Sequence, residues 1–281
     1  MQLINYIKIL RPLNLLISAL CVLLCAFILN QLSTGILPLM YTILLLAGFS
    51  NIINDIIDYK IDQENQMNRP IALQAISIRN ASIYALILFV LACLIIIIYQ
   101  FNDLTQILIF IINIPLIILY TPVFKKIPLI GNLIVSFILS MVFIVTSTYL
   151  EGNINSAIIP PIILSFFLML IREIVKDIAD IEGDKKFNIH TLPVKFGINT
   201  AISFISFFAL ILFFCSILIY YLYESYNVFY LFNVLIFIHC PLFFYIYQLS
   251  KNKTSIYCIY LSKVLKLITI FGVIVIYLAN N

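Results

Sequence analysis

An acidic stretch, NDIIDYKIDQENQMNRP, directly follows a long apolar run and is the first place in the chain where chemistry is expected. It contains Asp55, Asp58 and Asp62, whereas the preceding run from Pro12 to Asn54 carries no charged residue. The three aspartates stand at i, i+3 and i+7, a spacing that places their carboxylates on one face of an α-helix. We call this set the first ladder.

A second set of aspartates, Asp177, Asp180 and Asp184, repeats this spacing and is called the second ladder. The block NDIIDYKID aligns with KDIADIEGD, and a proline follows each block a few residues later. The alignment indicates a weak internal repeat that places one ladder at the end of each of two apolar segments.

Aspartates packed on one face repel each other unless cations neutralise them. Oxygen ligands without His or Cys suit Mg²⁺, which typically binds a few carboxylates together with substrate phosphates. Carboxylates, Mg²⁺ and basic side chains together could stabilise a diphosphate leaving group. The alternative is that both ladders are solvated helix ends with salt bridges. Basic residues near the ladders are Lys60, Arg69, Lys125, Lys126, Arg172 and Lys176.

The composition of the chain indicates that the protein lies in a membrane. Of the 281 residues, 64% are hydrophobic and 10% charged, and the mean hydropathy is +1.15. Soluble domains carry about 25% charged residues, so we predict an all-α membrane protein. The six cysteines lie in apolar stretches without a CxxC pair and are interpreted as packing residues.

Charge-free runs predict nine transmembrane helices at about 20 residues per crossing. All sixteen basic residues fall at one set of helix ends, so the positive-inside rule places the N-terminus in the cytoplasm and the C-terminus outside. We expect one domain, 1–281, with Asp-rich cytoplasmic loops at about 55–80 and 173–198. The expected spans are two helices within Pro12–Asn54, then Asn80–Asn102, Leu104–Phe124, Ile127–Leu150, Gly152–Ile171, Phe196–Tyr223, Ser225–Ser250 and Ile259–Leu278.

Several motifs together resemble the UbiA superfamily of intramembrane prenyltransferases. They are NDxxDxxxD followed by NRP, the N-terminal RPLN, the segment LYTPVFKKIPLIGNL, and REIVKDIADIEGDKKFNIHTLPVKFG. Within the superfamily, REIVKDIADIEGD with TLP is most similar to the digeranylgeranylglyceryl phosphate synthase branch. The sequence departs from the common pattern after NRP, where IALQAIS replaces a small glycine-bearing turn.

The resemblance implies nine helices around a central cavity. It also implies Mg²⁺-dependent transfer of a prenyl group from an allylic diphosphate to a lipophilic acceptor. Similarity to the digeranylgeranylglyceryl phosphate synthase branch implies that this group is geranylgeranyl. It implies one Mg²⁺ on Asp55, Asp58 and Asp62 and another on Asp177, Asp180 and Asp184. Catalytic roles would fall to Asp58, Asp180 and Asp184, the last as one candidate for the base. Residues expected to contact substrate are Asn14, Asn54, Arg69, Tyr120, Lys125, Lys126, Arg172 and Lys176.

Two other functions remain open at this stage. An aromatic acid, a quinone precursor or a porphyrin could replace the ether lipid as acceptor. A divalent-cation or proton-coupled transporter would also use acids in helices, but transporters place ionisable groups near the midplane, where this sequence has none. The expected partners are a prenyl diphosphate, the acceptor and membrane lipids, with no nucleic acid. The sequence leaves the oligomeric state open.

Overall fold

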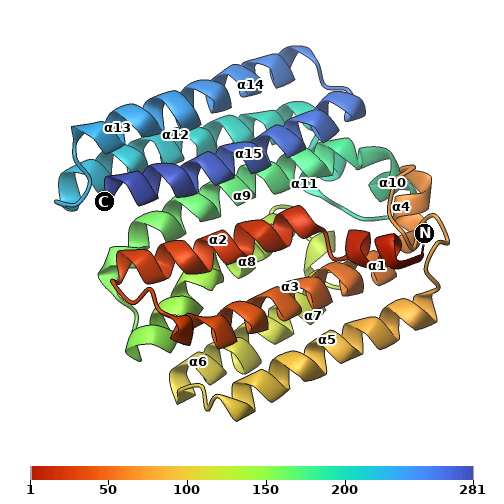
Figure 1. Cartoon of the computed structure of the whole chain (residues 1–281). Helices are drawn as coiled ribbons and strands as arrows, with labels where there is room; N and C mark the ends of the chain where they lie inside the picture. Colours follow the sequence, from red (N-terminus) through yellow and green to blue (C-terminus); the bar gives the residue numbers. More distant parts are fainter. Residues whose placement is uncertain (1, 281) are drawn as a thin grey trace. The chain divides into compact units, whose positions relative to one another are not determined.

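The computed structural model describes residues 2–280, and within that range the chain forms helices and no strand (Figure 1). The helices are α1 Gln2–Ile9, α2 Pro12–Ile28, α3 Leu37–Ile57, α4 Tyr59–Glu64, α5 Ile78–Ile98, α6 Asp103–Ile107, α7 Ile114–Tyr120, α8 Ile130–Glu151, α9 Ile159–Ala179, α10 Ile181–Lys186, α11 Leu192–Phe196, α12 Ile198–Leu222, α13 Val228–Val234, α14 Cys240–Lys251 and α15 Ser255–Ala279.

Between residues 2 and 280, eight helical segments are long and apolar enough to cross a membrane, and a bent pair at the N-terminus raises the number to nine. The pair is α1 and α2, which meet at 51°. The bend has a local cause: Arg11 adopts φ 55°, and Pro12 opens α2 without a backbone N–H to continue α1. The described residues thus hold eight or nine candidate spans, and the expected nine is reached when the bent pair counts as one span.

The helices that would meet lipid expose large apolar side chains. Ile97, Ile98 and Leu222 are 69%, 69% and 73% exposed, and similar residues recur along the other long helices except α9. In water such a surface would aggregate, but in a bilayer it contacts hydrocarbon at no cost. Exposure of this kind agrees with a multi-pass membrane protein.

Two predicted spans are not regular α-helices. A π-helical segment, Leu108–Asn113, joins α6 to α7, and another, Leu235–His239, joins α13 to α14. In both cases a proline, Pro115 or Pro241, follows within the first two residues of the next helix. Because proline lacks an N–H and clashes with the preceding turn, the backbone widens locally there.

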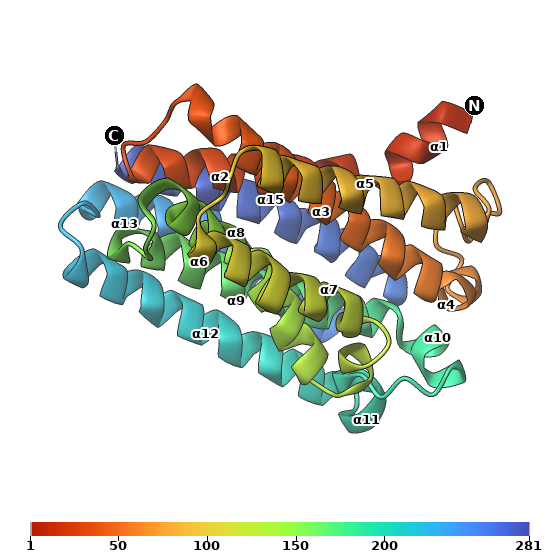
Figure 2. The ribbon, with the colours of Figure 1, turned by 90° about the horizontal axis from the view of Figure 1, so that it is seen from below.

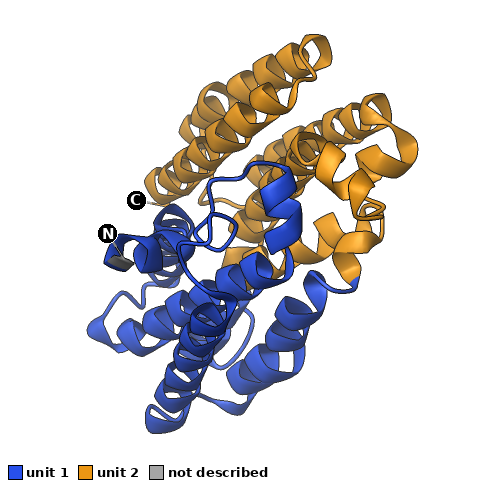
Figure 3. Cartoon of the chain, turned by 90° about the vertical axis from the view of Figure 1, so that its right-hand side faces the viewer, with its two compact units in different colours: residues 1–123, 142–155 blue, residues 124–141, 156–281 orange. Residues whose placement is uncertain are grey.

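The chain forms two compact units (Figure 3). Unit 1 comprises the chain up to Val123 together with Val142–Asn155, and unit 2 comprises Phe124–Met141 and the chain from Ser156 onward. In unit 1, α3 packs against α5 and α2 (Figure 2). Gly48 permits close packing against α5 and against the turn before α2, since a Cβ there would lie 3.2 Å from Leu88 and 3.1 Å from Leu10.

In unit 2, α9 packs against α12 and α15 and is the most buried of the candidate spans. The same local architecture occurs once in each unit. A 3₁₀ turn of 3 residues, a helix of 21 and a helix of 6 follow one another as Thr34–Ile36, α3 and α4, and again as Ser156–Ile158, α9 and α10. The repeat predicted from the aspartates therefore extends over whole helices.

Candidate functional site

The first ladder lies where α3 gives way to α4. Asp55 occupies the last turn of α3, Asp58 is the single residue between the two helices, and Asp62 lies in α4. Their exposed fractions are 2%, 3% and 5%, so all three are buried. The spacing predicts one shared helical face, and the structure interrupts the regular helix at Asp58, where φ is −85° and ψ is 2°.

The interruption at Asp58 changes the helix direction without losing backbone hydrogen bonds. Its N–H donates to the Asn54 carbonyl at 2.9 Å, and its own carbonyl accepts from the Asp62 N–H at 2.9 Å. The buried backbone is therefore satisfied on both sides of the break. The expected Asp-rich loop 55–80 accordingly begins as helix.

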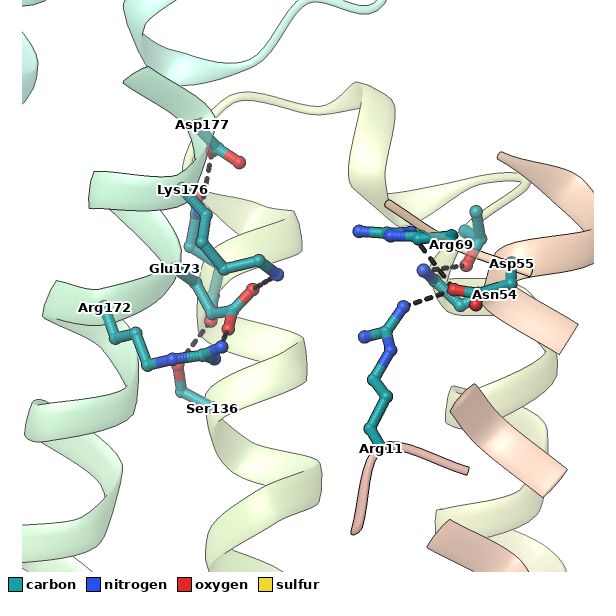
Figure 4. A network of polar contacts seen from close by, with 11 residues as sticks. Arg11, Asn54, Asp55, Arg69, Ser136, Arg172, Glu173, Lys176 and Asp177 are labelled. Carbon is teal, nitrogen blue, oxygen red and sulfur yellow. Dashed lines mark hydrogen bonds and ion pairs between the residues drawn. The ribbon is translucent and has the colours of Figure 1, made fainter. Parts of the chain in front are cut away.

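Two arginines bind the first ladder (Figure 4). Arg69 Nη1 lies 3.1 Å from Asp55 Oδ1 and 2.7 Å from Asp62 Oδ2, and Arg11 also pairs with Asp55. Charge-assisted bonds of this kind are about twice as strong as neutral ones. Arg69 therefore fixes the first and third aspartates relative to one another. We call Arg11 and Arg69 the arginine clamp.

Local backbone geometry positions the arginine clamp. Arg11 is held by the bend that begins α2, and Arg69 follows a turn in which Gln66 adopts φ 50°. The Met67 N–H closes that turn on the Asp62 carbonyl at 2.8 Å. On the other side of the ladder, Asn54 Oδ1 accepts a hydrogen bond from Thr121 Oγ1 at 3.1 Å.

The second ladder, in unit 2, is built in the same way. Asp177 lies in the last turn of α9, Asp180 is the single residue between α9 and α10 with φ −95° and ψ 6°, and Asp184 lies in α10. Neutral donors bind its ends: Asn132 Nδ2 donates to Asp177 Oδ2 at 2.7 Å, and Thr191 Oγ1 donates to Asp184 Oδ2 at 3.2 Å. The expected loop 173–198 is thus helical at its start.

Each ladder therefore receives hydrogen bonds from two directions. The first aspartate of each ladder is bound by a residue at the beginning of the preceding long helix, which is Arg11 in the first ladder and Asn132 in the second. The third aspartate is bound by the residue seven positions later in the chain, which is Arg69 in the first ladder and Thr191 in the second. This pattern holds the carboxylates in place before any ligand arrives, which is the preorganisation that charge stabilisation requires.

A group of charged side chains lies on α9 directly before the second ladder, with Arg172 and Glu173 buried and Lys176 half-buried. Glu173 Oε1 accepts from Arg172 Nη1, and Glu173 Oε2 accepts from Lys176 Nζ at 2.7 Å. The predicted substrate contacts Arg172 and Lys176 are thus brought together, by a glutamate outside the predicted set. We call Arg172, Glu173 and Lys176 the α9 triad.

The other predicted contact residues are placed as follows. Asn14 lies in the first turn of α2, and its N–H donates to the Arg11 carbonyl at 2.8 Å. Tyr120 ends α7 and is half-buried. Lys125 and Lys126 lie on a 3₁₀ turn, half-buried and exposed respectively.

Five residues of this arrangement lie outside the predicted set. Four of them belong to motifs that were visible in the sequence: RPLN contains Arg11, YTP contains Thr121, IGNL contains Asn132 and TLP contains Thr191. Each of these four is a polar residue at the edge of an apolar run, and this position is the sequence feature that could have identified it. The sequence did not show which residue each of them would contact. The fifth, Glu173, was visible as an acid beside two bases.

Among residues 2–280, no three His, Cys, Asp or Glu side chains converge on a common point at metal-binding distance. In the first ladder, the same Arg69 nitrogen contacts both Asp55 and Asp62. The first ladder is thus a carboxylate–guanidinium cluster, whereas neutral donors bind the ends of the second ladder.

Fold and site together define an all-helical, multi-pass membrane protein with two carboxylate clusters at the ends of spanning helices, of which the first is buried throughout. The chain belongs to the UbiA prenyltransferase family, whose model matches residues 14–277. It is therefore a prenyltransferase, and the resemblance seen in the motifs is confirmed.

Named relatives and solved structures agree with this membership. The digeranylgeranylglyceryl phosphate synthase of Methanosphaera stadtmanae is 35% identical over 270 residues, covering 93% of this chain and 94% of the relative. That of Methanobrevibacter smithii is 34% identical over 268 residues, covering 93% and 92%. A solved structure of a digeranylgeranylglyceryl phosphate synthase in membranes superposes with a TM-score of 0.73 at 25% identity, covering 99% of this chain and 98% of that one.

A UbiA homologue from Archaeoglobus fulgidus, solved with DMAPP and Mg²⁺, superposes with a TM-score of 0.69 at 19% identity, covering 97% of this chain and 99% of that one. At this identity the likeness concerns the fold. The helical architecture of the family thus extends over nearly the whole chain.

Proposed function

We propose that this enzyme transfers a geranylgeranyl group from its allylic diphosphate to geranylgeranylglyceryl phosphate, in ether-lipid synthesis. The observation that carries the proposal is the pair of aspartate ladders built on the same helix, break and short helix, in a chain 35% identical to a named digeranylgeranylglyceryl phosphate synthase. Nothing in a scaffold or structural role would need two such clusters.

The reaction replaces one C–O bond by another. The acceptor hydroxyl attacks the allylic carbon of the donor, the bond from that carbon to the diphosphate breaks, and the hydroxyl proton is released. Charge on the bridging oxygen grows as that bond breaks, so cations near the diphosphate stabilise the transition state. Arg69, Lys125 and Lys126 are assigned this role towards the donor.

Each ladder is assigned to one Mg²⁺ ion. The first ion is assigned to Asp55, Asp58 and Asp62, and the second to Asp177, Asp180 and Asp184. The donor set fits, because Mg²⁺ prefers carboxylate oxygens and typically takes one or two of them together with substrate phosphates and water. A site of that kind needs no three-ligand cage. When bound, Mg²⁺ neutralises the diphosphate charge. Asp58, Asp180 and Asp184 are the assigned catalytic residues, and Asp184 is the candidate to accept the hydroxyl proton.

Substrate positioning is assigned to residues around these carboxylates. Asn54 is oriented by Thr121 and supports the first ladder. Asn14 and Tyr120 are further assigned contacts, and Arg172 and Lys176 act from the α9 triad. Exclusion of water is essential in this chemistry because water would capture the allylic cation. Burial of the first ladder to 5% exposure or less supports that requirement.

The single-domain, cytoplasm-facing arrangement is also part of the proposal. One family model covers residues of both units, which supports one catalytic domain. The basic residues alternate with the spans, and this supports a cytoplasmic N-terminus and an extracytoplasmic C-terminus. Both ladders then face the compartment that supplies soluble Mg²⁺.

The test is a transfer assay with radiolabelled geranylgeranyl diphosphate and Mg²⁺, offering geranylgeranylglyceryl phosphate and 4-hydroxybenzoate in parallel. Label in the ether lipid alone is expected. Label in the aromatic acid would retain prenyl transfer and overturn the acceptor assignment. An intact donor with both acceptors, together with Mg²⁺ flux into vesicles, would favour a transporter.

A further inference from the structure

Charged side chains lie inside the spanning helix α9 before the second ladder begins. Arg172 is 8% exposed and Glu173 4%, and both belong to the segment Ser156–Ala179 that is long and apolar enough to cross a membrane. Ionisable side chains inside spanning helices are costly and mark substrate paths. The α9 triad therefore requires a functional explanation of its own.

The triad joins two cations through one carboxylate. Glu173 contacts both Arg172 and Lys176 (Figure 4). Guanidinium and ammonium groups are the two side chains that bind phosphate most readily. The triad thus has the composition of a phosphate site.

The geometry of the triad is fixed by Glu173. Arg172 and Lys176 stand at i and i+4, so they share one face of α9. Each is bound by a different oxygen of Glu173, which directs Lys176 back along α9 towards Arg172. The two cations are consequently oriented as a pair before a ligand binds, and the entropic cost of arranging them is already met.

We propose that the α9 triad binds the phosphate of the acceptor lipid, separately from the aspartates that serve the donor diphosphate. This inference rests on the proposed function and names the substrate group that a part of its site recognises. The triad would select acceptors that carry a phosphate monoester, and so act as the specificity determinant of the enzyme.

The spacing along α9 suits this assignment. Arg172 precedes Asp177 by five positions, which corresponds to about 7 Å along a helix that rises 1.5 Å per residue. In a glycerol phosphate the attacking hydroxyl is separated from phosphorus by a few bonds of about 1.5 Å each, and attack begins at about 3–3.5 Å. A phosphate at the triad therefore leaves its hydroxyl within reach of a diphosphate at the second ladder.

The experiment measures acceptor binding and turnover separately. Purified protein in nanodiscs is titrated with geranylgeranylglyceryl phosphate and with its dephosphorylated form, geranylgeranylglycerol, without Mg²⁺ or donor. The variants are Arg172→Gln and Lys176→Gln, with Lys176→Arg as the charge-preserving variant. Lys185→Gln is the matched control, because Lys185 is exposed on α10 and its replacement removes the same charge.

Wild type is expected to bind the phosphorylated lipid more tightly than the alcohol, and each Gln variant to lose about tenfold to a hundredfold of that preference, the usual cost of one charged hydrogen bond. Lys176→Arg is expected to recover most of it, and Lys185→Gln to match wild type. In turnover, the Gln variants should raise KM for the acceptor and leave KM for the donor unchanged.

Equal affinity of wild type for the phosphate and the alcohol would overturn the inference, as would an equal rise of both KM values in the variants. A preference for 4-hydroxybenzoate that depends on the triad would assign these cations to an aromatic carboxylate instead. Failure of the proposed function is distinguishable, because it would appear as absent transfer by wild type whatever the binding results.

Discussion

The guanidinium of Arg69 lies 2.7 Å from the carboxylate of Asp62, seven residues earlier in the chain. Thr191 stands in the same relation to Asp184, at 3.2 Å. The repeated contact shows that the segment after each short helix folds back on the last aspartate of its ladder. The chemistry differs, since Arg69 brings a charge and also reaches Asp55, whereas Thr191 brings a neutral hydroxyl.

The first prediction concerns the charge of Arg69. Arg69→Gln removes the cation that joins Asp55 to Asp62 and is assigned to the diphosphate, so kcat/KM for the donor should fall by about a hundredfold or more, the cost of losing at least two charged hydrogen bonds. Steady-state kinetics with varied donor measure this. Arg79→Gln is the control, because Arg79 is exposed at the start of α5. An unchanged kcat/KM in Arg69→Gln would remove Arg69 from the site.

The second prediction concerns the two aspartates at the helix breaks. Asp58→Ala or Asp180→Ala should reduce turnover to background, because each removes a carboxylate assigned to Mg²⁺, while membrane insertion and yield stay near wild type. Single-turnover assays on purified variants measure the effect. Glu182→Gln, at an exposed position of α10, removes a charge nearby and should retain activity. Full activity in either alanine variant would refute the metal assignment.

The third prediction concerns Asn132, the donor to Asp177. Asn132→Ala should raise the Mg²⁺ concentration needed for half-maximal activity by about tenfold or more, as loss of an outer-shell partner usually does. Asn132→Asp should be more harmful at low Mg²⁺, because it places a second carboxylate where a donor stood. Mg²⁺ titrations of turnover compare the variants. A shift in kcat without any shift in the Mg²⁺ requirement would contradict this role.

The fourth prediction concerns removal of metal. EDTA should stop transfer and added Mg²⁺ restore it, since the diphosphate charge is otherwise uncompensated. The unfolding temperature in detergent should change little on EDTA treatment, because arginines already bind Asp55 and Asp62 of the first ladder. A large drop in that temperature would instead indicate a structural metal.

The fifth prediction concerns topology. A reporter fused at the C-terminus, after α15, should be read out as extracytoplasmic, whereas one inserted between α4 and α5 should be cytoplasmic. Both follow from nine spans with basic residues inside. A cytoplasmic C-terminus would reduce the spans to an even number and leave α1 and α2 on the membrane surface.

The spans were predictable because bilayer thickness converts charge-free length directly into helices, and Ile198–Leu222 lies within the predicted Phe196–Tyr223. The breaks at Asp58 and Asp180 were not, because a single residue with ψ near 0° leaves the i, i+3, i+7 spacing intact.

The partners of the ladders were harder still to predict. Asp55 and Asp177 are bound by Arg11 and Asn132, which precede them by 44 and 45 residues. Periodicity describes only the faces of one helix, and it carries no information on which side chain of another helix will meet that face. Such contacts depend on tertiary packing, which the three-dimensional structure supplies.

The central claim is that the two ladders promote departure of diphosphate in step with ether formation. The most direct test is to measure diphosphate release and digeranylgeranylglyceryl phosphate formation in one reaction of the purified enzyme with Mg²⁺ and both substrates. One diphosphate per product is expected, with both signals absent in Asp58→Ala and in Asp180→Ala. Product formed without diphosphate, or at the wild-type rate in these variants, would contradict the account.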